Sequence, residues 1–421
     1  MIDLRPDRRR FGAALLGLAG LAALPASLRA ASIDTGALKS LTSGIKPIDA
    51  AERTMRIARA QALMAQSGLA AIVIEPGSSL DYFTGVKWWR SERVTVAIIP
   101  ASGQPVIVTP FFEEPSVRQS LGVLADVRVW QEDEDPLALV AEAVRQTGGA
   151  NAAIGIEETV RFFISDGIAR RLPLARIVSA DPVVRACRMV KTPAEIALMQ
   201  AASDVTETAL RWAWPRIKPG MGPSEIEALI DAATAALGGR PGGALVLLGE
   251  ASAYPHGSSK PQAVREGEVV LLDCGCSVGG YASDISRSFV VGKAPDDVRR
   301  VWDIVAEGQQ RALAAARLGT PACAVDDAVR AFYEAKGFGP RYQLPGLSHR
   351  TGHGIGMDGH EPVNLVHGET TPLAPGMCFS NEPGLYLPGK FGIRLEDCFH
   401  MTENGPQWFS TPPRSLDAPF G

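Results

Sequence analysis

Short, wholly apolar runs alternate in the first half of the chain with segments whose apolar residues recur at helical spacing. The runs that read as strands lie at residues 70–74, 94–99, 104–108 and 152–156. The segments that read as helices cover residues 51–68 and 136–146. Strands that alternate with helices indicate an α/β domain. We predict that this domain covers residues 48–185.

A helix-start signal separates this region from the rest of the chain. In Lys191-Thr192-Pro193-Ala194-Glu195, Thr192 is placed to cap a helix and Glu195 completes a capping box. The helix that starts here runs to about residue 214, and a second helix begins near residue 223. Two further helical patterns cover residues 296–317 and 325–336. The stretches between them read as strands and hairpins. We therefore predict a second domain at residues 190–421, of the α+β class with an antiparallel sheet.

A buried strand that ends in a carboxylate is the first chemical signal. Val269-Val270-Leu271-Leu272 describes a strand covered on both faces, and Asp273 follows it directly. A two-residue loop at Val278-Gly279 would pair Asp273 with Asp284 on the returning strand, with Cβ atoms about 5 Å apart. Two carboxylates that close repel unless a metal ion or a proton lies between them. The spacing therefore predicts a metal clamp on one hairpin.

A second acidic hairpin is expected near the C-terminus. Glu382 ends the run Phe379-Ser380-Asn381, and the chain then turns around Pro388-Gly389-Lys390. The returning segment Gly392-Ile393-Arg394-Leu395 leads to Glu396. With this spacing Glu382 and Glu396 could face each other across the hairpin.

Histidines are concentrated between the two acidic hairpins. The chain has 6 histidines, and three of them fall within residues 349–360. Glycines at 352, 354 and 356 surround His353 and let the backbone approach a ligand closely. Another histidine, His256, lies shortly before the first acidic strand.

Composition narrows the class of protein. The chain has 421 residues, 46% of them hydrophobic and 21% charged, which is enough for two globular domains with their own cores. The formal net charge is −4, and no basic stripe occurs. Phosphate binding needs clustered lysines and arginines, so nucleic acid is not an expected partner.

The N-terminus has the layout of a secretory signal. An arginine-rich start precedes an apolar stretch at residues 11–24, and small residues continue to about residue 30. Asp7-Arg8-Arg9-Arg10-Phe11 is similar to a twin-arginine signal. We predict a signal peptide at residues 1–30, export to the periplasm, and no stable membrane association after cleavage. A retained membrane anchor is the alternative, although the stretch is short and weakly apolar for one.

Together these motifs resemble the pita-bread (creatinase and methionine aminopeptidase-like) metallopeptidases, and within them the Xaa-Pro dipeptidases (prolidases) and Xaa-Pro aminopeptidases. Asp273 and Asp284 are similar to the family's two-aspartate signature, and residues 351–356 are similar to its prolidase-type histidine motif. Residues 382–384 and 392–397 are similar to its two glutamate motifs. The resemblance implies a creatinase-type N-terminal domain followed by a pita-bread catalytic domain.

The resemblance also implies a dinuclear metal centre. Asp284 and Glu396 would bridge both ions. Asp273 would complete one ion, and His353 with Glu382 would complete the other. Four carboxylates and one imidazole suit manganese, cobalt, iron or zinc, with manganese as the first choice. A hydroxide shared by the two ions would attack the scissile carbonyl.

Roles for the neighbouring residues follow from the same resemblance. Glu382 would carry a proton from water to the leaving nitrogen. His256 and His360 would donate hydrogen bonds to the tetrahedral intermediate. His349 and Arg394 would orient the site or hold a substrate carboxylate, and a structural role is the alternative for both.

The expected activity is removal of the N-terminal residue from Xaa-Pro dipeptides or short peptides. One alternative is a metal-dependent hydrolase or lyase of a small non-peptide molecule on the same scaffold. A non-enzymatic binding module is disfavoured because all five ligand positions are filled. Related dipeptidases are usually dimers, so a homodimer is expected. A loop with Trp88 and Trp89 would then cover the active site, and a merely packed aromatic loop is the alternative.

Overall fold

A computed structural model describes residues 33–148 and 151–420. The predicted signal peptide, residues 1–30, lies outside the described residues. Residues Leu38–Gly421 belong to one compact unit. In the described part of the chain, no helix is both long enough and apolar enough to cross a membrane.

Six strands form a mixed sheet in the first half of the chain, in the order β4-β3-β2-β1-β5-β6. The strands are β1 (Ala71–Ile74), β2 (Val96–Pro100), β3 (Val106–Pro110), β4 (Asp126–Trp130), β5 (Ala153–Ile156) and β6 (Arg176–Ser179). The helices are α1 (Ala50–Ser67), α2 (Ser78–Thr84), α3 (Glu114–Ser120), α4 (Pro136–Gly148), α5 (Phe162–Arg171) and α6 (Asp181–Met189). The sequence predicted α1, α4 and the four central strands. It missed the edge strands β4 and β6, whose residues are largely only half-buried and therefore less uniformly apolar.

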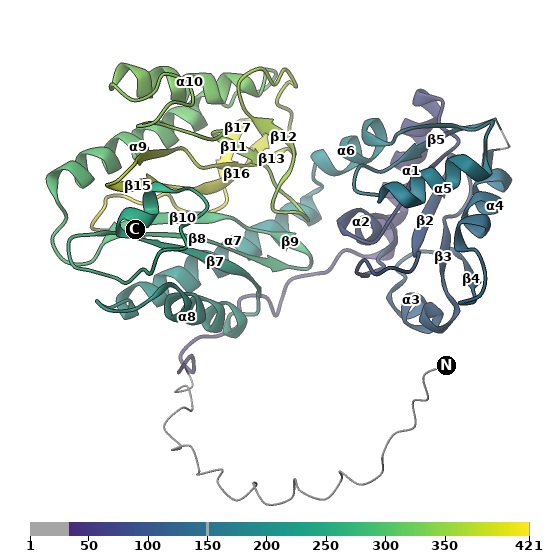
Figure 1. Cartoon of the computed structure of the whole chain (residues 1–421), viewed down its shortest axis with the longest axis horizontal. Helices are drawn as coiled ribbons and strands as arrows, with labels where there is room; N and C mark the ends of the chain where they lie inside the picture. The colour runs from purple at the N-terminus through teal and green to yellow at the C-terminus, as the bar shows by residue number, and fades with distance from the viewer. Residues whose placement is uncertain (1–32, 149–150, 421) are drawn as a thin grey trace, which may run out of the picture. The chain divides into compact units, whose positions relative to one another are not determined.

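Strand β1 separates two apolar cores. Ile72 and Ile74 point into a core shared with α1 and α6, and Val73 points into one shared with α4 and α5. Successive strand residues face opposite sides of a sheet, so helices on both faces bury the whole strand. Figure 1 shows these helices on the two sides of the sheet. The burial explains why this strand reads as an unbroken apolar run.

The second half of the chain contains helices and antiparallel sheets, as predicted. Its helices are α7 (Pro193–Ala213), α8 (Pro223–Ala236), α9 (Asp296–Ala315) and α10 (Cys323–Ala335). One sheet has the order β10-β8-β7, with β9 paired to β8, and another has the order β12-β11-β13-β16-β17. A two-stranded sheet joins β14 to β15. The strands are β7 (Arg240–Leu248), β8 (Val269–Val278), β9 (Tyr281–Ala282), β10 (Ile285–Val290), β11 (Gly352–Gly354), β12 (Glu361–Leu365), β13 (Cys378–Asn381), β14 (Gly384–Leu387), β15 (Phe391–Arg394), β16 (Asp397–Thr402) and β17 (Gly405–Trp408).

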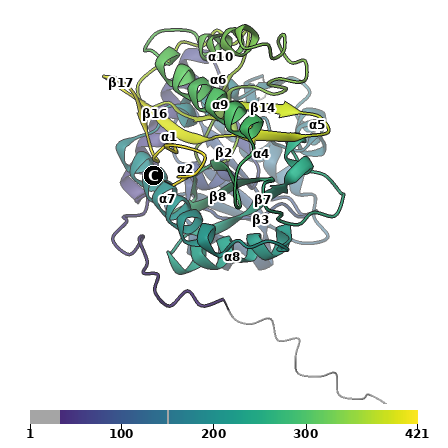
Figure 2. The same cartoon turned by 90° about the vertical axis from the view of Figure 1, so that its left-hand side faces the viewer.

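Strand β8 also lies between two cores. Leu271 packs in a core with Val301 of α9 and with residues of α10. Leu272 packs in another core with Leu210 of α7 and with residues of α8. Figures 1 and 2 show α7 and α8 on one side of β7 and β8, with α9 and α10 beyond the other strands. The acidic strand therefore runs through the middle of the domain.

The predicted start of α7 is confirmed. The Thr192 side chain accepts a hydrogen bond from the Glu195 amide, and the Glu195 carboxylate accepts one from the Thr192 amide over 2.8 Å. This capping box satisfies two amides that the first turn of a helix leaves without partners.

The predicted register of the first hairpin is wrong by two residues. The loop is Gly279-Gly280, and Val278 pairs with Tyr281. Both loop glycines have positive φ, 59° and 91°, which a two-residue turn of this kind requires and which valine would not adopt. Asp273 therefore lies opposite Ser286, not opposite Asp284. A shift of two keeps the side chain of Asp284 on the predicted face.

Candidate metal centre

The two acidic hairpins meet through the backbone of Ser286. This residue pairs with Asp273 on β8, and on its other side it forms an isolated bridge with Glu396. The amides and carbonyls of Ser286 and Glu396 exchange hydrogen bonds of 3.2 and 3.1 Å. Asp273 and Glu396 are consequently the two lateral neighbours of one residue. Asp284 lies two positions before it, in the gap between β9 and β10.

The strand pairings on either side determine how Glu382 and Glu396 lie relative to each other. Asn381 pairs with Asp397 on one side, and Gly384 pairs with Arg394 on the other. Between these two pairs, the same register places Glu382 opposite Glu396. The predicted second hairpin, with its turn after Leu387, is therefore confirmed.

His353 lies on β11, which pairs with β13, and its side chain points toward the carboxylates. Its side chain is 2% exposed. Its ring Nδ1 lies 3.1 Å from the carbonyl oxygen of Gly354, so Nδ1 carries the proton and donates to that carbonyl. The unprotonated Nε2 then faces Glu382 Oε1 at 3.3 Å and Asp284 Oδ2 at 3.8 Å. This is the tautomer that a histidine uses to bind a metal ion through Nε2.

The glycines around His353 permit this approach. A Cβ at Gly352 would lie 2.1 Å from the carbonyl oxygen of Ser380, on the neighbouring strand. Any side chain there would push the histidine strand away from the strand that leads to Glu382. Gly352 therefore permits close approach of two strands, and the predicted approach of the backbone to a ligand stays a prediction.

Three groups of donors lie close enough to hold metal ions, with the ligand atoms of each group within 4.8 Å of one another. Glu396 belongs to two of the groups, and Asp284 also belongs to two. The groups are Asp273 with Asp284 and Glu396, His353 with Glu382 and Glu396, and Asp284 with His353 and His360. The structure therefore brings all five predicted ligands together.

These residues fit a pair of divalent cations. Glu396 Oε2 accepts a hydrogen bond from Ser286 Oγ over 2.6 Å. Its other oxygen, Oε1, is buried and has no hydrogen-bond partner among the described residues. A buried carboxylate oxygen without a partner is costly, and a cation is the partner that such an oxygen binds best.

The ionisation of the carboxylates is strongly perturbed. Burial, followed by repulsion from neighbouring carboxylates, raises the pKa values of Asp284 and Glu396 well above their ordinary range. Burial also raises the pKa of Glu382 from 4.5 to about 7, against the opposing effect of Arg394. Burial and the adjacent His360 lower the pKa of His353 to about 3, so this imidazole is neutral. A site crowded with acids and holding a neutral imidazole is suited to cations.

Arg394 is bound into the centre from the side of Asp273. Its Nη2 donates to Asp273 Oδ2 over 2.6 Å, and its Nε donates to Ser286 Oγ over 3.1 Å. Its Nη1 donates to the carbonyl oxygen of Pro255, the residue before the exposed His256, over 3.2 Å. Arg394 is thus bonded directly to a predicted ligand.

His349 is linked to Arg394 through a tyrosine. Its Nδ1 lies 2.7 Å from the carbonyl oxygen of Arg350, and its Nε2 lies 2.7 Å from the hydroxyl of Tyr386. The same hydroxyl accepts a hydrogen bond from Arg394 Nη1 over 3.1 Å. Burial, with Arg394 nearby, lowers the pKa of His349 to about 3. A neutral His349 with its proton on Nδ1 accepts a hydrogen bond at Nε2 from the Tyr386 hydroxyl.

His360 borders the centre on its exposed side. Its ring centroid lies 4.0 Å from that of His353, and its Nδ1 lies 3.2 Å from Arg350 Nη2. The resemblance gave His360 a role beside the ligands, whereas its nitrogen also falls within one of the three donor groups. The roles predicted for the individual site residues stay predictions.

Family comparisons agree with this geometry. A family model described as "Metallopeptidase family M24" matches residues 197–403. A second family model, described as "Creatinase/Prolidase N-terminal domain", matches residues 56–190. A probable dipeptidase, PepE, of Mycobacterium tuberculosis is 33% identical over 378 residues, which cover 89% of this chain and 98% of the relative. The chain belongs to metallopeptidase family M24. The predicted family and the predicted pita-bread fold with a creatinase-type N-terminal domain are thereby confirmed.

Other M24 proteins are similar over most of their length. An Xaa-Pro dipeptidase of Lactobacillus helveticus is 30% identical over 343 residues, with 80% of this chain and 92% of the relative covered. The crystal structure of dipeptidase PepE from Mycobacterium ulcerans has a TM-score of 0.81 and 34% identity, and covers 88% of this chain and 99% of that chain. The family and these relatives support metal-dependent peptide hydrolysis.

Sequence reasoning missed Ser286 and Tyr386. Tyr386 lies on β14, and alternation along this segment puts positions 382, 384 and 386 on one face. That periodicity was the available signal for Tyr386. Ser286 gave no such signal, because it joins the site through its pairing with Glu396, which is distant in the sequence.

The aromatic loop expected to cover the site is partly exposed. Trp88 and Trp89 stack with ring centroids 4.8 Å apart, and Trp89 is 68% exposed. Both line a cleft of about 620 Å³ that also contains Gly279, Gly280 and Met357. The proposed covering role of this loop in M24 dimers stays a prediction.

Proposed function

We propose that this chain is a dinuclear-metal hydrolase that removes the N-terminal residue from Xaa-Pro dipeptides or short peptides. The observation that carries the proposal is the convergence of five donors into groups that share Glu396 and Asp284. Shared carboxylates are the arrangement with which proteins hold two ions close together. The names of the related proteins, an Xaa-Pro dipeptidase and two dipeptidases, support peptides as the substrate class.

The site would hold one ion between Asp273 and the shared carboxylates, and the other beside His353 and Glu382. Two divalent ions held in this way would supply Lewis-acid chemistry, by activating a water molecule and polarising the scissile carbonyl. Manganese is our first choice, with cobalt, iron and zinc as alternatives, because oxygen donors predominate.

The surroundings of Glu382 support its proposed role in proton transfer. Its Oε1 lies 3.3 Å from His353 Nε2 and 3.5 Å from Ser380 Oγ, and these neighbours hold its orientation. We assign it the transfer of a proton from water to the leaving nitrogen.

The exposed histidines would stabilise the intermediate. His360 and His256 are both solvent-accessible, and the His360 ring lies 4.0 Å from that of the predicted ligand His353. Each would donate a hydrogen bond to the tetrahedral intermediate, a contribution of about 10²–10³ in rate per donor in other enzymes. Arg394 is buried and His349 is half-buried, and both are held by hydrogen bonds, so we assign them primarily to orienting the site.

Export and assembly are separate proposals. The arginine-rich start and the weakly apolar stretch after it support export to the periplasm through a twin-arginine signal. The stacked Trp88 and exposed Trp89 support a homodimer in which this loop covers an active site. Cell fractionation and sedimentation of the mature protein test the two proposals independently.

The decisive experiment combines elemental analysis with activity. The purified protein is assayed on Xaa-Pro dipeptides and tripeptides and on matched peptides without proline, before and after chelation. We expect about two divalent ions per chain, cleavage ahead of proline, loss of activity on chelation and recovery with manganese. Two bound ions with no cleavage of any peptide would reject the peptidase and favour the small-molecule alternative.

A further inference from the structure

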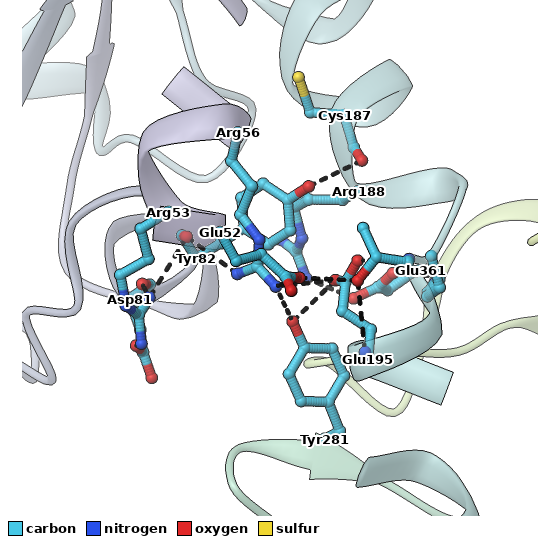
Figure 3. Close-up of polar contacts among 12 residues, drawn as sticks. Glu52, Arg53, Arg56, Asp81, Tyr82, Cys187, Arg188, Glu195, Tyr281 and Glu361 are labelled. Atoms are coloured by element: carbon cyan, nitrogen blue, oxygen red, sulfur yellow. Dashed lines mark hydrogen bonds and ion pairs between the residues drawn. The ribbon is translucent and has the colours of Figure 1, made fainter. Parts of the chain in front are cut away.

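Glu361 directly follows His360 and begins strand β12. Its side chain is 4% exposed and forms ion pairs with the side chains of Arg188 and Lys191. Lys191 Nζ donates to Oε2 over 3.0 Å, and Arg188 Nη2 donates to Oε1 over 2.5 Å. Figure 3 shows the carboxylate of Glu361 beside Arg188. Lys191 is 2% exposed, so this is a buried charged cluster.

The carboxylate also closes the turn that carries His360. Glu361 Oε1 accepts a hydrogen bond from the Asp358 amide over 3.1 Å. A Cβ at Gly356 would lie 2.7 Å from Glu361 Oε2, so the carboxylate packs directly against the histidine motif. The Gly356 carbonyl accepts a hydrogen bond from the Ala282 amide over 2.7 Å, which connects the turn to the first acidic hairpin.

The two basic residues, Arg188 and Lys191, lie in the segment that links the domains. Arg188 lies in the last turn of α6, and the Lys191 amide donates to the Gly376 carbonyl over 2.8 Å just before α7 begins. The first turn of α7 is fixed in turn, because Glu195 accepts a hydrogen bond from the Tyr281 hydroxyl over 2.7 Å. Arg56 Nη2 of α1 lies 3.4 Å from Oε1 of the same carboxylate. Figure 3 shows these side chains together. The anchor of Glu361 is therefore itself rigidly held.

Burial and the two cations have opposite effects on Glu361. Burial alone would raise its pKa, but Lys191 and Arg188 outweigh that effect and lower it to about 2. Buried ion pairs add little net stability when compared with apolar packing, whereas they can fix one geometry. The cluster is thus better explained by the position it imposes than by the stability it adds.

We propose that Glu361 is a positioning residue for His360. The carboxylate, clamped by Lys191 and Arg188, holds the turn from Gly356 to Glu361 so that the His360 ring stays beside His353 and faces the reacting carbonyl. This inference rests on the proposed peptidase function for the role of His360. The effect on the position of the turn does not depend on that function.

The test compares Glu361→Gln with wild type and with Glu75→Gln in the metal-loaded protein. Glu75 is a buried carboxylate bonded to Arg161 in the N-terminal domain, so its variant controls for loss of a buried charge. For Glu361→Gln we expect kcat to fall about ten- to hundredfold, with KM within about threefold and metal content unchanged. For Glu75→Gln we expect kcat to stay at the wild-type value. An unchanged kcat in Glu361→Gln, or an equal loss in both variants, would overturn the proposal.

A double-mutant cycle separates positioning from general stability. If Glu361 acts through His360, Glu361→Gln should cost no further activity in a His360→Ala background. Additive losses would show that the carboxylate has only a structural role. If Glu361→Gln does not fold, the pair Glu361→Gln with Lys191→Met removes two opposite charges together, leaves Arg188 paired with Asp358, and is compared in the same cycle.

Hydrogen exchange gives a readout that needs no substrate. Because the Asp358 amide bonds to Glu361, its exchange should accelerate at least about tenfold in Glu361→Gln and stay unchanged in Glu75→Gln. If the wild-type protein cleaves no peptide, the proposed function fails, while this comparison still decides whether Glu361 holds the turn. Unchanged exchange at Asp358 would overturn the positioning role by itself.

Discussion

Ser286 donates a hydrogen bond from Oγ to Glu396 Oε2 over 2.6 Å, while the backbones of the same two residues exchange hydrogen bonds across the strands. The shared carboxylate is therefore fixed through both its main chain and one of its oxygens. The second oxygen, Oε1, has no partner among the described residues. This arrangement leaves one defined direction in which Glu396 can bind a cation.

Replacing Glu396 by Gln should have opposite effects on metal binding and on the metal-free protein. The amide keeps the shape but cannot ionise, whereas Glu396 can be ionised only against burial and the repulsion of Asp284 and Glu382. We expect fewer than two ions per chain, and a metal-free melting temperature raised by about 2 °C or more. Elemental analysis and calorimetry measure both quantities, with the exposed Glu403→Gln as the matched control. A variant that keeps two ions would contradict a bridging role.

Replacing Arg394 by Lys should not be tolerated. A lysine cannot donate to Asp273, Ser286 and Tyr386 at once, because it lacks the planar fork of the guanidinium. We expect kcat/KM to fall about 10²-fold. Arg299→Lys alters an exposed arginine paired with Asp417, and its kcat/KM should match wild type. Steady-state kinetics on a cleaved peptide decide the matter, and equal values for the two variants would refute an orienting role for Arg394.

The metal-free protein should lose stability as pH rises. The pKa of Glu382 is raised from 4.5 to about 7, so its folded form holds a proton that its unfolded form has released. Its contribution to stability is fully present below pH 4.5 and is lost as pH rises through about 7. Asp284 and Glu396 shift in the same direction.

Melting temperatures at about pH 5 and about pH 8, with and without manganese, measure this effect. The increase caused by manganese should be larger at the higher pH, because binding needs deprotonated ligands. In Glu382→Gln the fall between the two pH values should be smaller. A metal-free wild type that is equally stable at both pH values would contradict the prediction.

Replacing Tyr386 by Phe should impair turnover without disrupting the fold. The ring stays in place, but His349 Nε2 loses its partner and Arg394 loses one of its acceptors. An unsatisfied buried acceptor costs about 1–3 kcal/mol, and a disturbed supporting residue costs about 10–100-fold in activity. We expect kcat to fall within that range while metal content is kept. The exposed Tyr342→Phe serves as the control, and a wild-type kcat in Tyr386→Phe would show that the hydroxyl has no part in turnover.

Residues close in sequence were predictable, and residues joined by the fold were not. The apolar strand before Asp273, the glycines around His353 and the turn between Glu382 and Glu396 all leave local patterns. Each pattern restricts what the backbone can do within about ten residues, so the ligand-bearing segments could be recognised from the sequence alone.

The prediction of the hairpin register was wrong because the wrong pair of residues was assigned to the loop. Val278-Gly279 and Gly279-Gly280 are both short loops, but only the second supplies two residues that adopt positive φ freely. Ser286 and the cluster of Glu361 with Lys191 and Arg188 depend on contacts between distant segments. No periodicity in the sequence reports such contacts.

The donors of the centre are spread from Asp273 to Glu396, on separate strands that meet only in the finished domain. A polypeptide that is still unfolded has no preformed place for a cation, so metal uptake must follow chain folding. The ions available in the compartment where folding is completed would then determine which metal the protein binds. For an exported chain, this makes the route of secretion a determinant of enzyme composition.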